Sequence, residues 1–303
     1  MLILMLLVFL AGASWMLAQS GSLGGHNRAN EVTASAMAQA KEALIGRAAT
    51  DNNRPGSLTC PDVDNNGVAN GDFGNCDALV GRFPWKTLDV PELLDGNGER
   101  LWYALSFNLR DHNSSPAINP LTLLQLTLDG SPPNIAAIIF SPGAPLSNQN
   151  GRPSNAVTDY LDGSNNDGDS AYVSGPQSAT FNDKVLVITR ENLFNAVNRR
   201  ILGEIRGDAL SGLVKSYAEN GNNYPWAAAD ALGVPSAGEL GPYLPYTALV
   251  LPSETTTPPM FSSNNWYPLI AYNVNVSRQQ VTLTISTPSP VICKITPGQP
   301  LCQ

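Results

Sequence analysis

The sequence predicts an α+β fold in which a helix packs on a small antiparallel sheet and a second unit of the same kind follows. Three observations support this prediction. An apolar segment, residues 1–18, runs almost directly into an amphipathic helical pattern at 30–50. Short apolar runs bounded by turn residues come next, as expected for buried strands. A second helical pattern at 191–219 is again followed by strand-like runs.

The first helical pattern, 30–50, has apolar side chains at three- and four-residue spacing, which places them on one face of a helix. These residues are Met37, Ala40, Leu44 and Ala48. Asn30 is a candidate N-cap. We expect the helix to end before Pro55 and Gly56, because proline lacks the N–H donor and glycine frees the backbone.

The second helical pattern carries one apolar face, and we expect a bend near Gly207, because glycine weakens a helix by about 1 kcal/mol relative to alanine. The face consists of Val197, Ile201, Ile205, Leu213 and Tyr217. The runs expected as strands are 101–107, 136–143, 184–190, 264–274 and 279–286.

The two halves of the chain contain the same series of sequence features in the same order. In each, a helical pattern leads to an N-x-P break and later to a WYxL run, at 102–105 and at 266–269. This shared order favours a duplication over coincidence. We therefore divide the chain into an apolar helix and the stretch after it, a first helix-and-sheet unit and a second one. The divisions are 1–29, 30–189 and 190–303.

The charge of the chain argues against nucleic acid as a partner. The formal net charge is −8, and the Lys and Arg residues are scattered along the sequence. A protein that binds a phosphate backbone needs a basic stripe that releases counterions. We expect no binding of nucleic acid.

Four cysteines lie in two sequence-local pairs, which permit three connectivities. Closing a loop between near neighbours costs the least chain entropy, so the local pairing is favoured. The expected disulfides are Cys60–Cys76 and Cys293–Cys302. The alternative is four buried thiols in a cytosolic protein.

The segment between the first two cysteines has the composition of a calcium loop. Oxygen side chains at its first, third and fifth positions and Gly67 at the sixth match the turn that a calcium loop makes around a hard cation. Phe73 replaces the usual glutamate at the twelfth position, so a neighbouring carboxylate has to substitute. The candidate Ca²⁺ ligands are Asp62, Asp64, Asn66 and Asp72. The alternative is a solvated turn.

Signatures of catalysis are missing from the sequence, which contains no G-x-S-x-G, H-E-x-x-H, S-x-x-K or G-x-x-x-x-G-K. We expect a protein that is not an enzyme. A hydrolase that uses only carboxylates is the alternative, with Trp85, Trp226 or Trp266 stacking on sugar rings instead of filling the core.

Each of the two expected units contains several short motifs. In the first unit they are AQAKEALIG, RPGSLTCPD and DGNGERLWYAL. In the second they are Tyr217, the NG-x-x-YP run that ends at Tyr224-Pro225, Leu232-Gly233 and the GPYLP run at 241–245. The motifs of the first unit are similar to those of type IV pilin-like proteins of Gram-negative bacteria, and those of the second resemble the major pseudopilins of type II secretion. The resemblance implies a pilin-like fold and assembly through the N-terminal helix.

Residues 1–18 carry no charged side chain. As a helix they span about 27 Å, just short of the ~30 Å hydrocarbon core of a bilayer. A signal peptide is the alternative, since Ala11-Gly12-Ala13 has the small-x-small pattern of a cleavage site. The near-continuity with the amphipathic helix favours a retained anchor.

We therefore expect a structural subunit, a minor pilin or pseudopilin of a type IV pilus or type II secretion filament. It would be a single-pass inner-membrane protein with a periplasmic domain, and it would enter a filament. Its partners would be other pilin or pseudopilin subunits and the inner-membrane assembly machinery. The alternative is an exported soluble protein with a cleaved signal peptide, either a calcium-dependent binding protein or a carboxylate hydrolase.

Overall fold

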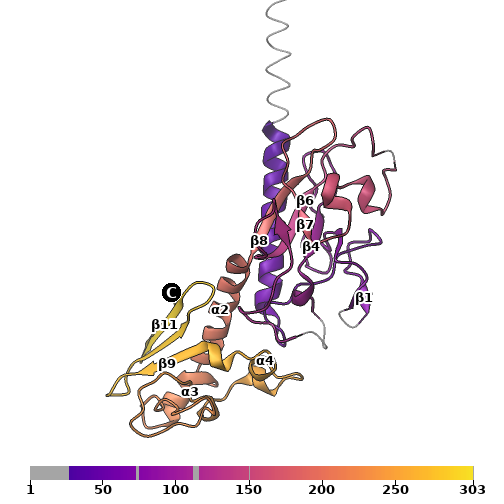
Figure 1. The fold of residues 1–303 in the computed structure, drawn as a ribbon. Coiled ribbons are helices and arrows are strands. Elements are labelled where there is room, and N and C mark those ends of the chain that lie inside the picture. The colour runs from indigo at the N-terminus through magenta and orange to yellow at the C-terminus, as the bar shows by residue number, and fades with distance from the viewer. Residues whose placement is uncertain (1–26, 73–74, 112–115, 150, 303) are drawn as a thin grey trace, which may run out of the picture.

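The computed structural model describes residues 27–72, 75–111, 116–149 and 151–302. Within these residues the chain combines helices with antiparallel sheets, which confirms the α+β class (Figure 1). The apolar segment 1–18 lies outside them, so the predicted apolar half of the first helix is not part of the description. The pilin-like character of the fold stays a prediction.

The first helix covers 27–50 in the described residues. Its buried face is the predicted one, with Met37, Ala40, Leu44 and Ala48 between 0% and 5% exposed. The expected N-cap is wrong, because Asn30 lies inside the helix and its amide oxygen accepts a hydrogen bond from Lys184 Nζ instead.

The end of the first helix is confirmed. The Asp51 carboxylate accepts the backbone N–H groups of Asn53 and Arg54, at 2.9 and 2.7 Å. Gly56 then turns the chain at φ +98°, where a Cβ would lie 2.9 Å from Ile118 Cγ2. The predicted glycine is therefore required by both backbone conformation and space.

The first sheet is antiparallel with the strand order β3-β4-β6-β8. These strands are β3 Val80–Arg82, β4 Trp102–Leu105, β6 Ile135–Ser141 and β8 Lys184–Thr189. Tyr103 and Ile139 face the cluster that contains the first helix, whereas Trp102 and Phe140 face a second cluster closed by Tyr160 and other residues of the loops. Both faces are covered, which explains the unbroken apolar run of β6.

α2, Arg190–Arg206, begins directly after β8, where Thr189 and Asn192 form a capping box. The bend expected near Gly207 is a break, since α3, Gly212–Glu219, is a separate helix. Gly207 has φ +67°, and a Cβ there would lie 2.2 Å from Ser211 O. The predicted apolar face is buried on α2 and at Leu213.

The second sheet has the order β12-β11-β10-β9, all antiparallel. Its strands are β9 Ile270–Val274, β10 Val281–Ile285, β11 Val291–Thr296 and β12 Gln299–Cys302. α2 contacts β10, β11 and β12. β10 alternates between buried and half-buried residues, as predicted. The hairpin β11–β12 was not among the expected strands.

The WYxL runs of the two halves differ in structure, so the prediction that the two halves repeat the same elements is wrong at this point. Residues 102–105 form β4, whereas Tyr267–Leu269 form a 3-10 turn before β9. The reason is Pro268, which has no N–H to give to a strand ladder.

Short elements complete the described chain: β1 Gly71–Asp72, β2 Asn75–Cys76, β5 Thr127–Leu128, β7 Ala171–Tyr172 and α4 Met260–Ser263. One hydrophobic cluster runs from Ala36 on the first helix through α2 to Ile295 on β11. The second sheet lies at the end of the molecule remote from the start of the first helix (Figure 1). The predicted division at 189 and 190 stays a prediction.

The structure corrects the expected location in the inner membrane. In the part of the chain that it describes, no helix is both long enough and apolar enough to cross a bilayer. The segment on which that expectation depended, 1–18, lies outside the described residues. A single-pass membrane protein is therefore not supported.

Candidate functional site

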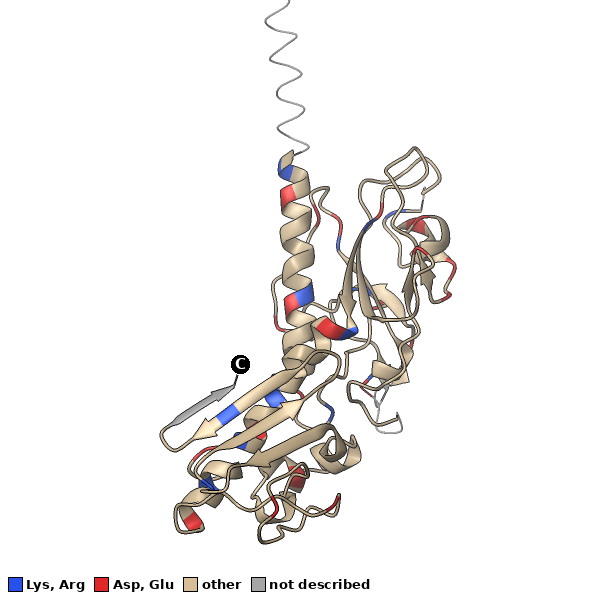
Figure 2. Ribbon diagram, turned by 60° about the vertical axis from the view of Figure 1, so that its left-hand side comes forward, with Lys and Arg blue, Asp and Glu red and all other residues tan. Residues whose placement is uncertain are grey.

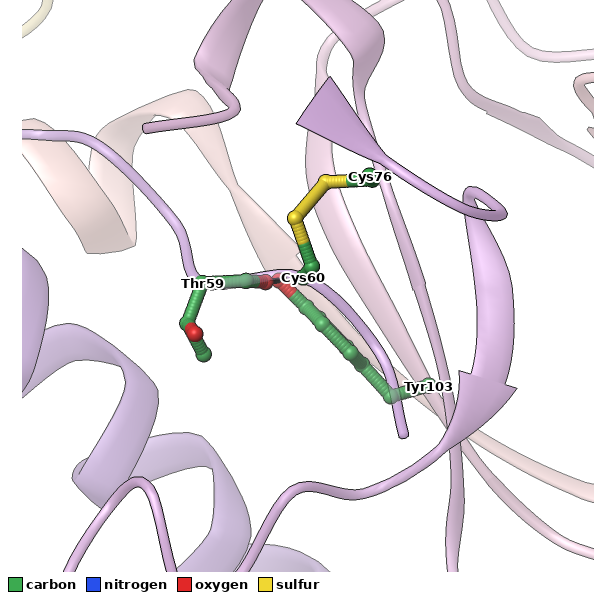
Figure 3. Close-up of a disulfide and its surroundings, with 4 residues drawn as sticks. All are labelled: Thr59, Cys60, Cys76 and Tyr103. Atoms are coloured by element: carbon green, nitrogen blue, oxygen red, sulfur yellow. Dashed lines mark hydrogen bonds between the residues drawn. A yellow bond between two sulfur atoms is a disulfide. The ribbon is translucent and has the colours of Figure 1, made fainter. Parts of the chain in front are cut away.

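The loop between Cys60 and Cys76 is closed by the predicted disulfide (Figure 3). Next to this bridge, the hydroxyl of Tyr103 on β4 donates a hydrogen bond to Thr59 O, at 3.2 Å. The bridge thus ties a surface loop to a segment that is anchored on the first sheet.

The second pair of cysteines lies on the C-terminal hairpin. Cys293 on β11 is disulfide-bonded, and its register partner on β12 is Cys302. The side chain of Cys302 lies outside the description, so the pairing Cys293–Cys302 stays a prediction.

Asp62, the first candidate calcium ligand, is buried and accepts hydrogen bonds from the backbone of its own loop. It is 1% exposed, and its carboxylate oxygens accept the N–H groups of Asn65 and Gly67, each at 2.7 Å. Burial raises the pKa of Asp62, while these backbone N–H groups act in the opposite direction. The carboxylate therefore stabilises the turn.

The other three candidates are divided between the turn and the hairpin after it. The Asn66 amide donates to Asp64 Oδ2 at 2.8 Å, and Asn66 Oδ1 accepts the N–H of Val68. Asp72 lies on β1 with Asn75 as its register partner, and its side chain is outside the description. Among residues 27–72, 75–111, 116–149 and 151–302, no group of three or more His, Cys, Asp or Glu side chains is arranged to hold a metal.

Two protein cations bind the carbonyl groups of this turn. Lys86 Nζ donates to Asn66 O, and Arg100 Nη1 donates to Asn65 O at 2.7 Å. Carbonyl oxygens are among the ligands that Ca²⁺ takes in proteins. These contacts satisfy two such oxygens without an added ion, and calcium at Asp62, Asp64, Asn66 and Asp72 stays a prediction.

Asp95 opens the DGNGE turn and fixes it to the first sheet. One carboxylate oxygen accepts the Ser141 hydroxyl at 2.8 Å and the Gly143 N–H at 3.1 Å. The other accepts the N–H groups of Asn97 and Glu99. Asp95 is 2% exposed. The sequence motif alone indicates no role for this aspartate, since its partners on β6 and beyond are distant along the chain.

The same turn contacts the first helix through Gly96. Its N–H donates to Thr33 Oγ1 at 2.9 Å. A Cβ on Gly96 would lie 2.1 Å from Ala29 O, so the backbone of the turn lies directly against the helix. The first helix is thereby held by a loop as well as by the sheet.

Lysine side chains attach the first helix to the edge strand β8. Lys41 Nζ donates to Val187 O at 3.1 Å and to Asn192 Oδ1 at 2.8 Å. Lys184 at the start of β8 reaches Asn30. These bonds use a carbonyl of the sheet edge that would otherwise be free to pair with another strand.

The opposite face of the first helix is exposed and consists mainly of small or short polar side chains. We call this set the outer helix face: Ala34, Ser35, Ala38, Gln39, Glu42 and Gly46. A shallow groove beside it is lined by Ser35 and Gln39 and by residues 91–94. The helix thus has one face on the core and one free face.

A pair of buried carboxylates is formed by one aspartate of the Asp- and Asn-rich stretch 159–169 and one aspartate just before β8. Asp162 and Asp183 are 2% and 4% exposed. Asp162 accepts Gln149 Nε2 at 2.8 Å and the Asn182 N–H at 2.7 Å, and Asp183 accepts the N–H of Asp162 at 2.8 Å. Because both carboxylates are enclosed, this pair is placed for structure and not for contact with a substrate.

The three tryptophans considered as sugar platforms differ. Trp266 is 0% exposed, and the indole nitrogens of Trp85 and Trp266 are buried. Trp226 instead lines an open cleft. The core interpretation therefore holds for Trp266, whereas Trp226 lines a cleft.

We compared the chain with models of protein families, with curated proteins and with solved structures, and none of them matches it.

Proposed function

We propose that this chain is a structural, non-enzymatic subunit of a pilus-type filament, a minor pilin or pseudopilin of a type IV pilus or type II secretion system. Its partners are other subunits of that filament and the machinery that assembles it. The proposal rests on the pilin-like motifs of the sequence and on the way in which the first helix is mounted.

The observation that best supports the proposal is that the first helix has one face buried on the first sheet and an opposite face that is exposed. One face is buried on the first sheet, and the Gly96 turn and Lys41 hold it there. The outer helix face stays exposed. Small side chains let helix axes approach closely, because the distance between packed helices depends on the side chains at the contact. A rigidly mounted helix with such a face suits lateral packing in a filament.

The disulfide Cys60–Cys76 supports an exported protein, since stable disulfides form mainly in oxidising compartments. The charge pattern is compatible with this function. Basic and acidic residues are interspersed over the helices and loops (Figure 2). The expectation that the chain does not bind nucleic acid stays a prediction.

The test is to isolate filaments from the cells that make this protein. The filaments are sheared off or extracted, purified by density and analysed by mass spectrometry, and gold-labelled antibodies locate the chain in electron micrographs. We expect the chain in the filament fraction and gold along or at the end of the filaments. A chain found only in fractions without filaments would contradict the proposal.

A further inference from the structure

A cleft of about 450 Å³ lies between the end of α3, the segment after it and the turn from β9 to β10. It is lined by Ser216, Glu219, Asn220, Trp226 and Arg278, together with prolines and an alanine. The structural-subunit proposal does not use this cleft, so a role for the cleft is independent of that proposal.

Arg278 is fixed in the wall of the cleft by its backbone. Its N–H donates to Asn275 O at 2.8 Å, and its carbonyl accepts the N–H of Tyr224 at 3.0 Å. The residue has φ +57°, a left-handed conformation that glycine or asparagine adopts more easily. Such conformations cluster at functional sites, where the surrounding structure holds them in place.

The side chain of Arg278 is held in one orientation, and some of its hydrogen-bond donors have no partner among the described residues. Nε donates to Tyr224 O, and the guanidinium carbon lies 4.9 Å from the centre of the Trp226 ring. Within the described residues, neither terminal nitrogen of Arg278 has a hydrogen-bond or ion-pair partner. A fixed guanidinium with two free nitrogens is suited to a carboxylate, which it binds with two parallel hydrogen bonds.

The charged side chains around the cleft favour a ligand that carries a single negative charge. Lys215 pairs with Glu219, so Arg278 is the cation whose charge no carboxylate of the lining compensates. Either anion would face Glu219, and a phosphate group, which carries up to two negative charges, would be repelled more strongly than a carboxylate. A carboxylate therefore fits this cleft better than a phosphate.

The remaining lining fits a sugar ring. One face of Trp226 lies under the Arg278 guanidinium, and the part of the indole that lines the cleft offers apolar contact for the ring. Ser216 and Asn220 offer hydroxyl and amide groups for its hydroxyls.

We propose that the cleft between Trp226 and Arg278 binds an acidic sugar, a uronic acid unit of an anionic polysaccharide. Arg278 binds the carboxylate, the part of the Trp226 indole that lines the cleft contacts the ring, and Ser216 and Asn220 bind hydroxyl groups. The site contributes recognition of a glycan and no bond is made or broken.

The test measures binding of short oligogalacturonates to the full chain by calorimetry and by saturation-transfer NMR. Their methyl esters are the matched control ligand, since they keep the rings and lose the charge. We expect saturable binding of the acid and about tenfold weaker binding of the ester, as a lost charge-assisted hydrogen bond implies.

Variants locate the site. Arg278→Gln should weaken binding of the acid by about tenfold, and Trp226→Ala should weaken binding of acid and ester alike. Arg199→Gln is the matched control, because Arg199 is an exposed arginine of α2 that does not line the cleft. It should bind as the unchanged chain does, and melting temperatures exclude loss of the fold as the cause.

Four results would overturn the proposal. They are equal binding of acid and ester, equal losses in Arg278→Gln and Arg199→Gln, no saturable binding at millimolar sugar, and displacement of the sugar by inorganic phosphate or by a short peptide at lower concentration.

Discussion

At the scale of single residues, Asp183 is the buried group whose titration has the clearest consequence. Burial raises its pKa to about 7, the charge of Asp162 adds to this, and hydrogen bonds from Asn165 and from the N–H of Asp162 oppose it, as does Arg152. Its Oδ1 is buried without a hydrogen-bond partner among the residues described. The ionised form of Asp183 is therefore disfavoured in the folded chain.

The raised pKa gives a pH dependence with a definite sign. Between the unfolded value near 4 and about 7, the folded chain binds the proton of Asp183 more tightly than the unfolded chain does. The contribution of this group to stability is full below pH 4 and is lost as the pH rises through 7.

Asp183→Asn should remove this pH dependence. An amide oxygen can still accept the N–H of Asp162 and the Asn165 amide, and the Nδ2 group replaces the unpartnered oxygen. We expect the variant to be more stable than the unchanged chain at pH 8, with the difference shrinking towards pH 4. Urea unfolding at a series of pH values measures it. A difference that does not change with pH would contradict the assignment of the titration to Asp183.

Residue identities were predictable from the sequence where one local rule decided them. The apolar face at Met37 and Leu44 follows from the helical period of the sequence. The turn at Gly56 follows from the backbone freedom of glycine. Asp62 was predicted as a ligand from its spacing, but three backbone N–H groups of its own loop bind it. Spacing does not reveal whether a carboxylate turns inwards or outwards.

Among contacts between elements, the one between the DGNGE turn and the first helix fixes the position of the helix on the rest of the fold. Gly96→Ala would place a methyl group 2.1 Å from Ala29 O, so the turn or the helix has to move. We expect a loss of about 1–3 kcal/mol in the free energy of unfolding, as for other overpacked sites. Hydrogen exchange should rise at the N–H of Gly96, which bonds to Thr33.

Gly203→Ala on α2 is the matched control for this substitution. No atom lies within 4 Å of a Cβ at that position, and the residue is inside a helix. It should gain up to about 1 kcal/mol from helix propensity. If Gly96→Ala were as harmless as Gly203→Ala, the close approach of the turn to the helix would be refuted.

Elements were predicted where apolar runs are unbroken and missed where prolines interrupt them. β6 and β8 follow the sequence pattern. β12 contains Pro300 and resembles an irregular tail, yet it pairs with β11 through Thr296 and Gln299. Proline is tolerated there because β12 is at the edge of the sheet, where a missing N–H costs no ladder bond.

At the scale of the whole molecule, Asn264, which follows α4 directly, joins the break after the first helix to the C-terminal part of the chain. It is 2% exposed. Its amide donates to Asn53 O at 2.8 Å and to Met260 O at 2.8 Å, and its Oδ1 accepts the N–H of Ile118 at 3.1 Å. No sequence pattern pairs residues this far apart, and so the contact between these segments was not predictable.

Asn264→Ala should uncouple these segments. The buried N–H of Ile118 and the carbonyls of Asn53 and Met260 lose a partner, which costs about 1–3 kcal/mol for a buried group left unpaired. Denaturant unfolding measures the loss in the free energy of unfolding. Asn223→Ala is the control, because among the residues described its side chain bonds to the nearby Gly221 O and to Gln279 Nε2. A loss no larger than that of the control would contradict the linking role.

The proposed function requires that copies of this chain, or related subunits, pack against the outer helix face. Cysteine crosslinking in cells that assemble the filament tests it most directly, with Ala38→Cys on that face and Ala179→Cys, an exposed alanine of a loop, as the matched control. After a short bifunctional maleimide is added, we predict crosslinked species that contain this chain for Ala38→Cys and mainly single chains for Ala179→Cys. Equal crosslinking of the two variants would contradict the claim.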